Sequence, residues 1–162
     1  GGHASHFVTR DRRLKAELKA GLAAESGNEP DIFSLVAAEA ALSGGAPWLD
    51  ELKAYLRGNI EETVTRLNKE IPEIRAYRPQ GTYLVWADVS ALVKTMNYTG
   101  DTELVRELEL SGRVKLTPGS AFGRPGRGFV RINTACPRSR LGEALNRMAY
   151  FFSKSRTASS LT

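Results

Sequence analysis

One arginine stands inside an otherwise apolar segment, where its type and position suit it to bind an anion. The segment Phe129 to Asn133 has the pattern of a β-strand, and Arg131 lies between Val130 and Ile132. Because side chains alternate between the two faces of a strand, Arg131 points away from both neighbours. It therefore either faces water or is held for an anionic ligand. A guanidinium matches a planar carboxylate, with which it forms two parallel charge-assisted hydrogen bonds.

The other residues with reactive or polar side chains carry weaker signals. Asn133 shares a face with Arg131 at i, i+2, so it either orients the arginine or makes a structural hydrogen bond. Cys136 is interpreted as a small buried residue, because no basic side chain stands beside it to activate a nucleophile. His3 and His6 fall on opposite faces of an extended segment, so no shared metal ion is expected.

The composition is that of an ordinary globular domain. Of the 162 residues, 41% are hydrophobic and 25% charged, which argues against disorder. The net charge is +5, but the basic residues are scattered, so no nucleic-acid partner is expected. One cysteine forms no internal disulfide, and no run of about 18 apolar residues or signal peptide is apparent. We therefore expect a cytoplasmic protein without a membrane partner.

Three helices are predicted in the first 71 residues, after a short strand within residues 1–8. The first is capped by Asp11 and runs to about Ser26, and the second begins at Pro30 or Asp31 and ends at 43–45. The third runs from 46 to 71 and would be about 40 Å long, so it is expected to connect two parts of the protein. Apolar residues recur on the first two helices, at Leu14, Leu18, Leu22, Ile32, Phe33 and Val36.

The remainder alternates strands with helices. Strands are predicted at 74–77, 82–89, 114–116 and 129–133. A helix is predicted at 101–110 with Asp101 as its cap, and another after Pro137 with one apolar face. The fold class is therefore α/β, a small antiparallel or mixed sheet with helices packed on one face.

Several separated motifs together resemble a known family. They are Trp48-Leu49-Asp50-Glu51-Leu52, Tyr55-Leu56, Gly58-Asn59, Pro79-Gln80-Gly81-Thr82-Tyr83-Leu84-Val85-Trp86, Pro118-Gly119, Phe122-Gly123, Gly128-Phe129-Val130-Arg131-Ile132-Asn133 and Ala135-Cys136-Pro137-Arg138. In this order they resemble the C-terminal part of the MalY/PatB branch of class I/II aminotransferases. These are pyridoxal 5'-phosphate (PLP) enzymes of fold type I, many of them cystathionine β-lyases.

The resemblance implies how the chain is organised. Residues 1–45 would be a remnant of the PLP-binding large domain, 46–71 a connecting helix, 72–156 the small C-terminal domain and 157–162 a flexible tail. In the family the cofactor lysine lies in a Ser-Lys-x-Phe-Asn segment a few residues before an Ala-Gly pair. Gly1-Gly2 matches that pair, so the resemblance implies that the lysine would lie just before Gly1. Lys15, Lys53, Lys94 and Lys115 are in no matching motif. No catalytic, cofactor-binding or metal-binding residue is therefore expected in this chain.

The resemblance also assigns a substrate site. It implies that Arg131 binds the α-carboxylate of an amino-acid substrate, with Asn133 beside it and with Gly81 and Tyr83 near the mouth of the site. The expected role is a part of a PLP-dependent cystathionine β-lyase or aminotransferase; the alternative is a non-catalytic structural or interaction module derived from that family. The expected partners are the missing large domain and, because apolar helix faces would be uncovered, a second copy of the chain.

Overall fold

The computed structural model describes residues 7–24 and 31–159. The chain divides into two compact units between Glu51 and Leu52. His3 and His6 lie outside the described residues, as does most of the strand predicted within residues 1–8. Phe7 and Val8, at its end, are not in a strand and are exposed, so this part of the prediction is wrong.

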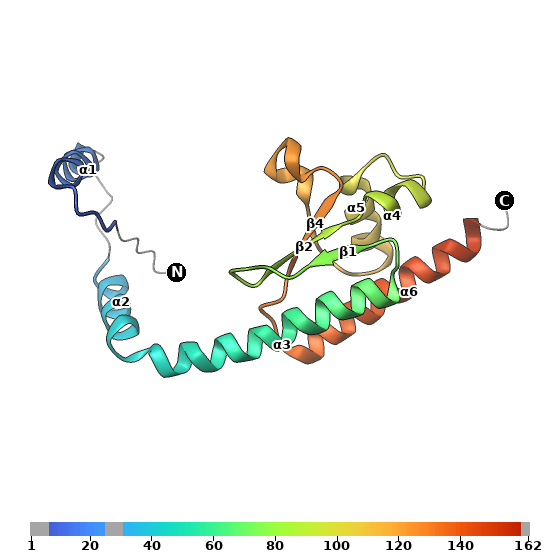
Figure 1. The fold of residues 1–162 in the computed structure, drawn as a ribbon, viewed down its shortest axis with the longest axis horizontal. Helices are drawn as coiled ribbons and strands as arrows, with labels where there is room; N and C mark the ends of the chain where they lie inside the picture. The colour runs from blue at the N-terminus through green and yellow to red at the C-terminus, as the bar shows by residue number, and fades with distance from the viewer. Residues whose placement is uncertain (1–6, 25–30, 160–162) are drawn as a thin grey trace. The chain divides into compact units, whose positions relative to one another are not determined.

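The first unit consists of helices whose ends follow from local capping chemistry. Helix α1 (Arg12–Ala24) is capped by the Asp11 carboxylate, which accepts hydrogen bonds from the backbone N–H of Arg13 at 2.8 Å and of Leu14 at 3.2 Å. Helix α2 (Ile32–Gly44) is capped in the same way by Asp31, and α3 (Ala46–Glu70) begins in this unit (Figure 1). The three predicted helices are confirmed within the described residues.

The second unit contains a four-stranded sheet in the order β1-β2-β4-β3, and every neighbouring pair is antiparallel. The strands are β1 (Arg75–Tyr77), β2 (Leu84–Asp88), β3 (Thr117–Pro118) and β4 (Phe129–Asn133). Between them lie helices α4 (Ser90–Thr95) and α5 (Asp101–Ser111) and the 3-10 turns η1 (Gly119–Phe122) and η2 (Arg124–Gly126), and helix α6 (Arg138–Ser159) follows β4. This is the α/β fold with a small antiparallel sheet that the sequence predicts.

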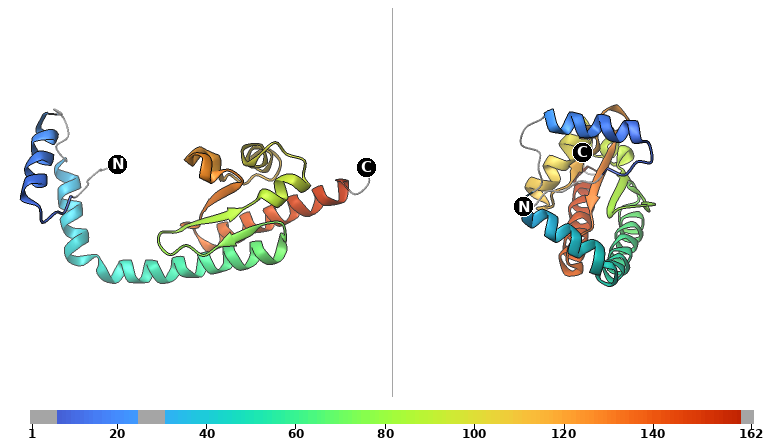
Figure 2. Two further views of the ribbon diagram at one scale, coloured as in Figure 1. Left: turned by 45° about the horizontal axis from the view of Figure 1, so that its top comes forward. Right: turned by 90° about the vertical axis from the view of Figure 1, so that its left-hand side faces the viewer.

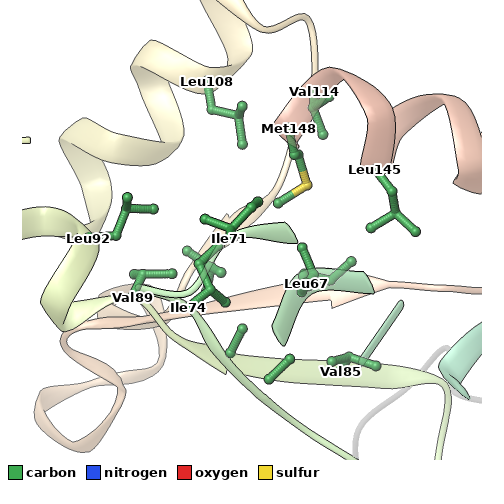
Figure 3. Close-up of a cluster of buried hydrophobic side chains, with 14 of the residues drawn as sticks. Leu67, Ile71, Ile74, Val85, Val89, Leu92, Leu108, Val114, Leu145 and Met148 are labelled. Carbon is green, nitrogen blue, oxygen red and sulfur yellow. The ribbon is translucent and has the colours of Figure 1, made fainter. Parts of the chain in front are cut away.

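Helices α3 and α6 run side by side along one face of the sheet (Figures 1 and 2). The Arg66 guanidinium of α3 donates to the Asn146 side chain of α6 at 2.7 Å and so ties the two helices together. The core lies between the helices and the sheet, and Figure 3 shows Leu67 of α3, Leu145 and Met148 of α6 and Val85 of β2 within it. Burial of these side chains is the main force that holds the sheet on the helices.

Burial alternates along the two central strands. In β2, Val85 and Ala87 are buried, and in β4, Val130 and Ile132 are buried, so these residues face the helices. The intervening residues, among them Arg131, are only partly buried and point to the other face of the sheet. The sequence pattern of β4 therefore fixes the side on which Arg131 is displayed.

Four details differ from the predictions. Residues 114–116 are not a strand, because Val114 is drawn into the core and pairing begins only at Thr117. Asp101 is not the cap of α5, since Gly100 takes that position while the Asp101 carboxylate bonds to a distant loop. Helix α4 was not predicted. Helix α6 continues to Ser159, past residue 156, where we expect the tail to begin.

No single helix in the described part of the chain is long and apolar enough to cross a membrane. Helices α2 and α3 satisfy the length and composition test only when they are taken together across the bend between them.

Candidate functional site

Arg131 occupies the middle of the sheet, with a strand on each side. Its residue partners are Trp86 in β2 and Thr117 in β3, directly opposite it in the two antiparallel ladders. Directly opposed residues in an antiparallel pair project to the same face, so the Trp86 side chain lies beside that of Arg131. Both are half-buried on the face that points away from α3 and α6.

An aromatic ring covers one side of the Arg131 guanidinium. The guanidinium carbon lies 4.5 Å from the ring centroid of Phe122, a cation–π contact. The Phe122 ring meets Trp86 edge-on with 5.4 Å between centroids, and Trp86 meets Phe129 at 6.3 Å. No carboxylate of the described residues forms an ion pair with Arg131. The guanidinium thus contacts the Phe122 ring, which itself packs on Trp86, while its charge stays uncompensated.

The loop that carries Phe122 is anchored to helix α5 by Asp101. The buried Asp101 carboxylate accepts hydrogen bonds from the backbone N–H of Ser120 at 2.9 Å and of Gly128 at 3.2 Å. Burial by itself raises the pKa of Asp101, but the hydrogen bonds from Ser120 and Gly128 outweigh it, so the pKa lies below its ordinary value of 3.8. The ionised Asp101 carboxylate therefore binds the backbone near both ends of the loop and attaches the loop to α5.

Two glycines allow the same loop to fold back on itself. A Cβ on Gly119 would lie 2.1 Å from the Gly126 carbonyl oxygen, and a Cβ on Gly126 would lie 2.0 Å from the Gly119 oxygen. These distances are far below van der Waals contact, so the two backbone segments approach closely only because neither residue has a side chain. This close approach determines the course of the loop backbone between the two glycines, where Phe122 lies.

The other end of β4 is held by a buried amide on α3. Asn59 is fully buried, and its Nδ2 donates to the carbonyl oxygens of Thr134 at 2.9 Å and Cys136 at 3.0 Å. Its Oδ1 accepts from Nε of Arg138 at 3.1 Å. One side chain thus binds three successive parts of the turn between β4 and α6.

Arg138 completes this attachment at the first residue of α6. Its backbone N–H donates to the Tyr55 hydroxyl at 2.7 Å, and its guanidinium lies 4.7 Å from the Tyr55 ring centroid. A Cβ on Gly58 would lie 2.6 Å from the Arg138 guanidinium nitrogen, so the glycine leaves room for the arginine. The Gly58-Asn59 and Pro137-Arg138 motifs therefore meet in space and fix the turn that follows Arg131.

The residues predicted beside Arg131 occupy distinct places. Asn133 shares the face of Arg131, but its Oδ1 accepts from the backbone N–H of Ala135 at 2.9 Å, which is the structural alternative. The Tyr83 carbonyl accepts from the backbone and hydroxyl of Thr134, while its side chain is 41% exposed. Gly81 lies in the loop before β2 with open space around it. The Tyr83 backbone is thus hydrogen-bonded to the residue after β4. A Cβ on Gly81 would have no atom within 4 Å, so Gly81 does not pack against Arg131.

Sequence reasoning assigned no role to Trp86, Phe122, Asn59 or Arg138. Asn59 had a signal, because it falls on the apolar stripe of α3 with Leu56, Thr63 and Leu67, where a buried amide needs partners. Phe122 carried no comparable signal, since a loop aromatic finds its partner only in the folded chain.

All seven lysines, which include Lys15, Lys53, Lys94 and Lys115, are exposed. In the described ranges no group of three or more His, Cys, Asp or Glu side chains is arranged to hold a metal ion. The candidate binding group of this unit is therefore the Arg131 guanidinium, whose chemistry suits an anion.

Comparison with known proteins places this geometry in a family. No protein-family model matches the chain. The chain is 35% identical to cystathionine β-lyase PatB of Bacillus subtilis over an alignment of 148 residues, and this alignment covers 91% of this chain and 37% of PatB. It is 40% identical over 114 residues to protein MalY of Escherichia coli, which covers 70% of this chain and 28% of MalY. It is 36% identical over 135 residues to LL-diaminopimelate aminotransferase of Nitratidesulfovibrio vulgaris, with 82% of this chain and 33% of that relative covered. The chain spans about a third of the length of such relatives.

Solved structures of PLP-bound enzymes are also similar to this chain. A PLP-bound putative aminotransferase from Clostridium difficile matches with a TM-score of 0.79 and 38% identity, over 88% of this chain and 35% of that one. A PLP-bound C-S lyase from Staphylococcus hominis matches with a TM-score of 0.78 and 26% identity, over 90% and 36%. The chain therefore belongs to the MalY/PatB branch of the PLP-dependent aminotransferase family, of whose members it represents about a third.

Proposed function

We propose that this chain supplies the part of a PLP-dependent enzyme that recognises the α-carboxylate of an amino-acid substrate. The enzyme would be a cystathionine β-lyase or an aminotransferase, the two activities that the names of the relatives carry. Arg131 is the residue that binds the carboxylate. PLP and the lysine that holds it would come from the remainder of a longer protein, which is the proposed partner of this unit.

The observation that carries the proposal is the uncompensated charge of Arg131. A half-buried guanidinium loses part of its hydration and usually gains a carboxylate partner in return. Arg131 instead has Phe122 on one side and no ion pair in the described residues. A substrate carboxylate would provide the missing partner, and two parallel hydrogen bonds would fix the direction of the substrate Cα.

The proposal is tested in a chimera of the B. subtilis relative, in which this chain replaces the aligned 148 residues. Arg131→Ala should lower kcat/KM by about ten- to a hundredfold or more, because the loss of even one hydrogen bond to a charged group costs about 1.5 to 3 kcal/mol. Arg131→Lys keeps the positive charge but cannot form two parallel hydrogen bonds with one carboxylate, so its kcat/KM should lie between those of the alanine variant and the parent. PLP absorbance should be unchanged in all three proteins.

A matched pair of substrates separates carboxylate recognition from general damage. The parent chimera should prefer an S-alkyl cysteine to the corresponding S-alkyl cysteamine, which lacks the α-carboxylate. Arg131→Ala should lose this preference while its activity on the amine is retained. If the alanine variant keeps both the parent kcat/KM and the preference, Arg131 is an ordinary solvated strand residue and the proposal is wrong.

A non-catalytic interaction module is the second candidate, and the exposed apolar side chains of α2 favour it. Ile32, Phe33 and Val36 are 70%, 82% and 62% exposed, which suits a surface that meets another protein. The reading frame upstream of Gly1 separates the candidates. A Ser-Lys-x-Phe-Asn segment in frame would support the enzyme, and a start codon immediately upstream of Gly1 would support the module.

We also propose a cytoplasmic location, as the sequence predicts. The single cysteine supports it, because Cys136 forms no disulfide within the chain. Cell fractionation followed by immunoblotting would test this, and recovery of the protein outside the cytoplasmic fraction would contradict it.

A further inference from the structure

A cavity lies in the second unit, and Arg131 is not among the residues that line it. Its volume is about 500 Å³, and its walls come from residues 113–116, from the turn after β4 and from the first turns of α6. Ile132, which lines it, alternates with Arg131 along β4, so the cavity opens on the helix side of the sheet. The Ile132 wall of the cavity therefore lies on the opposite side of β4 from Arg131, and Asn133, at the end of the strand, also lines the cavity.

The walls of the cavity carry an excess of positive charge. Four cationic residues line it, Arg113, Lys115, Arg140 and Arg147, against one acidic residue, Glu143. Two of the four are neutralised: Arg147 pairs with Glu143, and the Lys115 ammonium lies 3.1 Å from a Glu109 carboxylate oxygen. No carboxylate of the described residues pairs with Arg113 or Arg140. Two guanidiniums thus remain for a ligand.

Behind the charged residues, the lining is apolar. Val114, Ile132, Leu141 and Leu145 belong to the hydrophobic core and form part of the cavity wall. A ligand that matches both features has an anionic head and a compact apolar body. A phosphomonoester has a charge near −2 at neutral pH and three terminal oxygens, enough for two guanidinium forks, whereas a carboxylate satisfies only one.

We propose that this cavity is a binding site for a small organic phosphate, in which Arg113 and Arg140 hold the phosphate and the apolar wall receives its carbon body. The proposal does not rest on the function proposed for Arg131, because neither Arg131 nor Phe122 lines the cavity; Asn133 does line it, but Arg113 and Arg140 are the residues that would hold the phosphate.

Cys136 makes the proposal measurable in the chain as it stands. It is the only cysteine of the protein, it is partly exposed, and it lines the cavity. Any thiol reagent therefore reports on this cavity alone. The dianionic disulfide 5,5'-dithiobis(2-nitrobenzoate) should react faster than it does with a free cysteine peptide, because the local positive field concentrates anions. The neutral reagent 4,4'-dithiodipyridine should show no such acceleration.

The decisive variant is Arg113→Gly/Arg140→Ala. Glycine is chosen because Arg113 has φ of 56°, a conformation that glycine adopts without strain. The double variant should react about tenfold more slowly with the dianionic reagent and at an unchanged rate with the neutral one. Phenyl phosphate should protect Cys136 in the parent chain but not in the double variant, and benzyl alcohol should protect in neither.

Arg124→Ala/Arg127→Ala is the matched control, since it removes the same charge from two arginines, at the start of η2 and just after it, that do not line the cavity. This control should keep both the fast anionic reaction and the protection by phenyl phosphate. The proposal is overturned if phenyl phosphate gives no protection in the parent, or if the control variant loses protection to the same extent as Arg113→Gly/Arg140→Ala. Protection by inorganic phosphate equal to that by phenyl phosphate would overturn the role of the apolar wall.

Discussion

Arg131 is held in place by groups that leave its charge intact. The cation–π contact with Phe122 restrains the guanidinium without adding a negative charge, unlike an ion pair. A partner of opposite charge would compete with a substrate carboxylate, and an unrestrained arginine would lose rotamer entropy on binding. Aromatic packing avoids both costs, so the aromatic neighbours are as much a part of the site as the arginine.

Asn59 is the residue whose loss should most weaken the region behind Arg131. Asn59→Ala leaves the Thr134 and Cys136 carbonyls without their donor and Arg138 Nε without its acceptor. We expect the free energy of unfolding of the chain to fall by about 2–4 kcal/mol. Urea denaturation followed by circular dichroism measures this.

Asn146→Ala is the control for that experiment. Asn146 is exposed and makes its hydrogen bond with the Arg66 side chain, so the loss should be below about 1 kcal/mol. Equal losses for Asn59→Ala and Asn146→Ala would contradict the special position of Asn59.

At the scale of elements, the loop from Gly119 to Gly128 depends on helix α5. The Asp101 carboxylate binds both ends of this loop, and Thr102 adds a contact between its hydroxyl and that of Ser120 at 3.1 Å. These polar attachments fix the loop to α5, in addition to the contact of Phe122 with Trp86. Phe122, and through it Arg131, is therefore positioned from the first turn of α5.

The stability of the loop should depend on pH through Asp101. Its pKa in the folded chain is below 3.8, so the stabilisation is fully present above the unfolded value and is lost as pH falls through the folded value. Asp101→Asn should lower the urea midpoint at pH 7, and the difference from the parent should shrink steadily below pH 4. A difference that stays constant from pH 7 to pH 2 would contradict this role of the carboxylate.

The close backbone approach in the loop can be tested with two glycine substitutions. Gly119→Ala places a Cβ against the Gly126 and Phe129 carbonyl oxygens, which are backbone atoms, and should destabilise the chain by about 3 kcal/mol. Gly81→Ala is the control, because no atom lies within 4 Å of its added Cβ, and its melting temperature should match that of the parent. Equal melting temperatures of the two variants would show that the loop accommodates a side chain.

The limits of sequence prediction are visible in these same elements. Helices α1, α2 and α3 were predicted because their caps and apolar spacing are local signals. Asp101 was misassigned because its partners are 19 and 27 residues away, and a cap is the best local explanation of an aspartate before a helix. The position of Arg131 was predictable from alternation along β4, whereas its contact with Phe122 depends on how the loop returns to the sheet.

At the scale of the whole molecule, the first unit leaves its apolar side chains uncovered. Exposed fractions reach 44% for Leu14, 48% for Leu22 and 82% for Phe33, which confirms the expectation that these faces are partly uncovered in the isolated chain. The chain spans about a third of its relatives, so these faces are available to the remainder of a longer protein or to a second copy.

We expect the isolated chain to associate through these faces. Contiguous apolar surface of this kind is rare on monomers, so a dimer or higher oligomer should form at micromolar concentration. Phe33→Glu/Val36→Glu should shift the population toward the monomer, which static light scattering would detect. A monomeric parent chain whose Phe33 and Val36 are protected from solvent would show that the chain covers these faces itself.

The pairing of β4 on both of its edges restricts how this protein can change during evolution. A deletion of one residue within Phe129–Asn133 would turn Arg131 toward the core and Ile132 toward solvent, because the two faces alternate at every position. Length changes in the Arg78–Tyr83 loop carry no such penalty, since they leave the register of β2 and β4 intact. Insertions and deletions among related chains should therefore gather in that loop and be absent from the strand, so that the spacing from Arg131 to Arg138 stays constant while the lengths of surface loops drift.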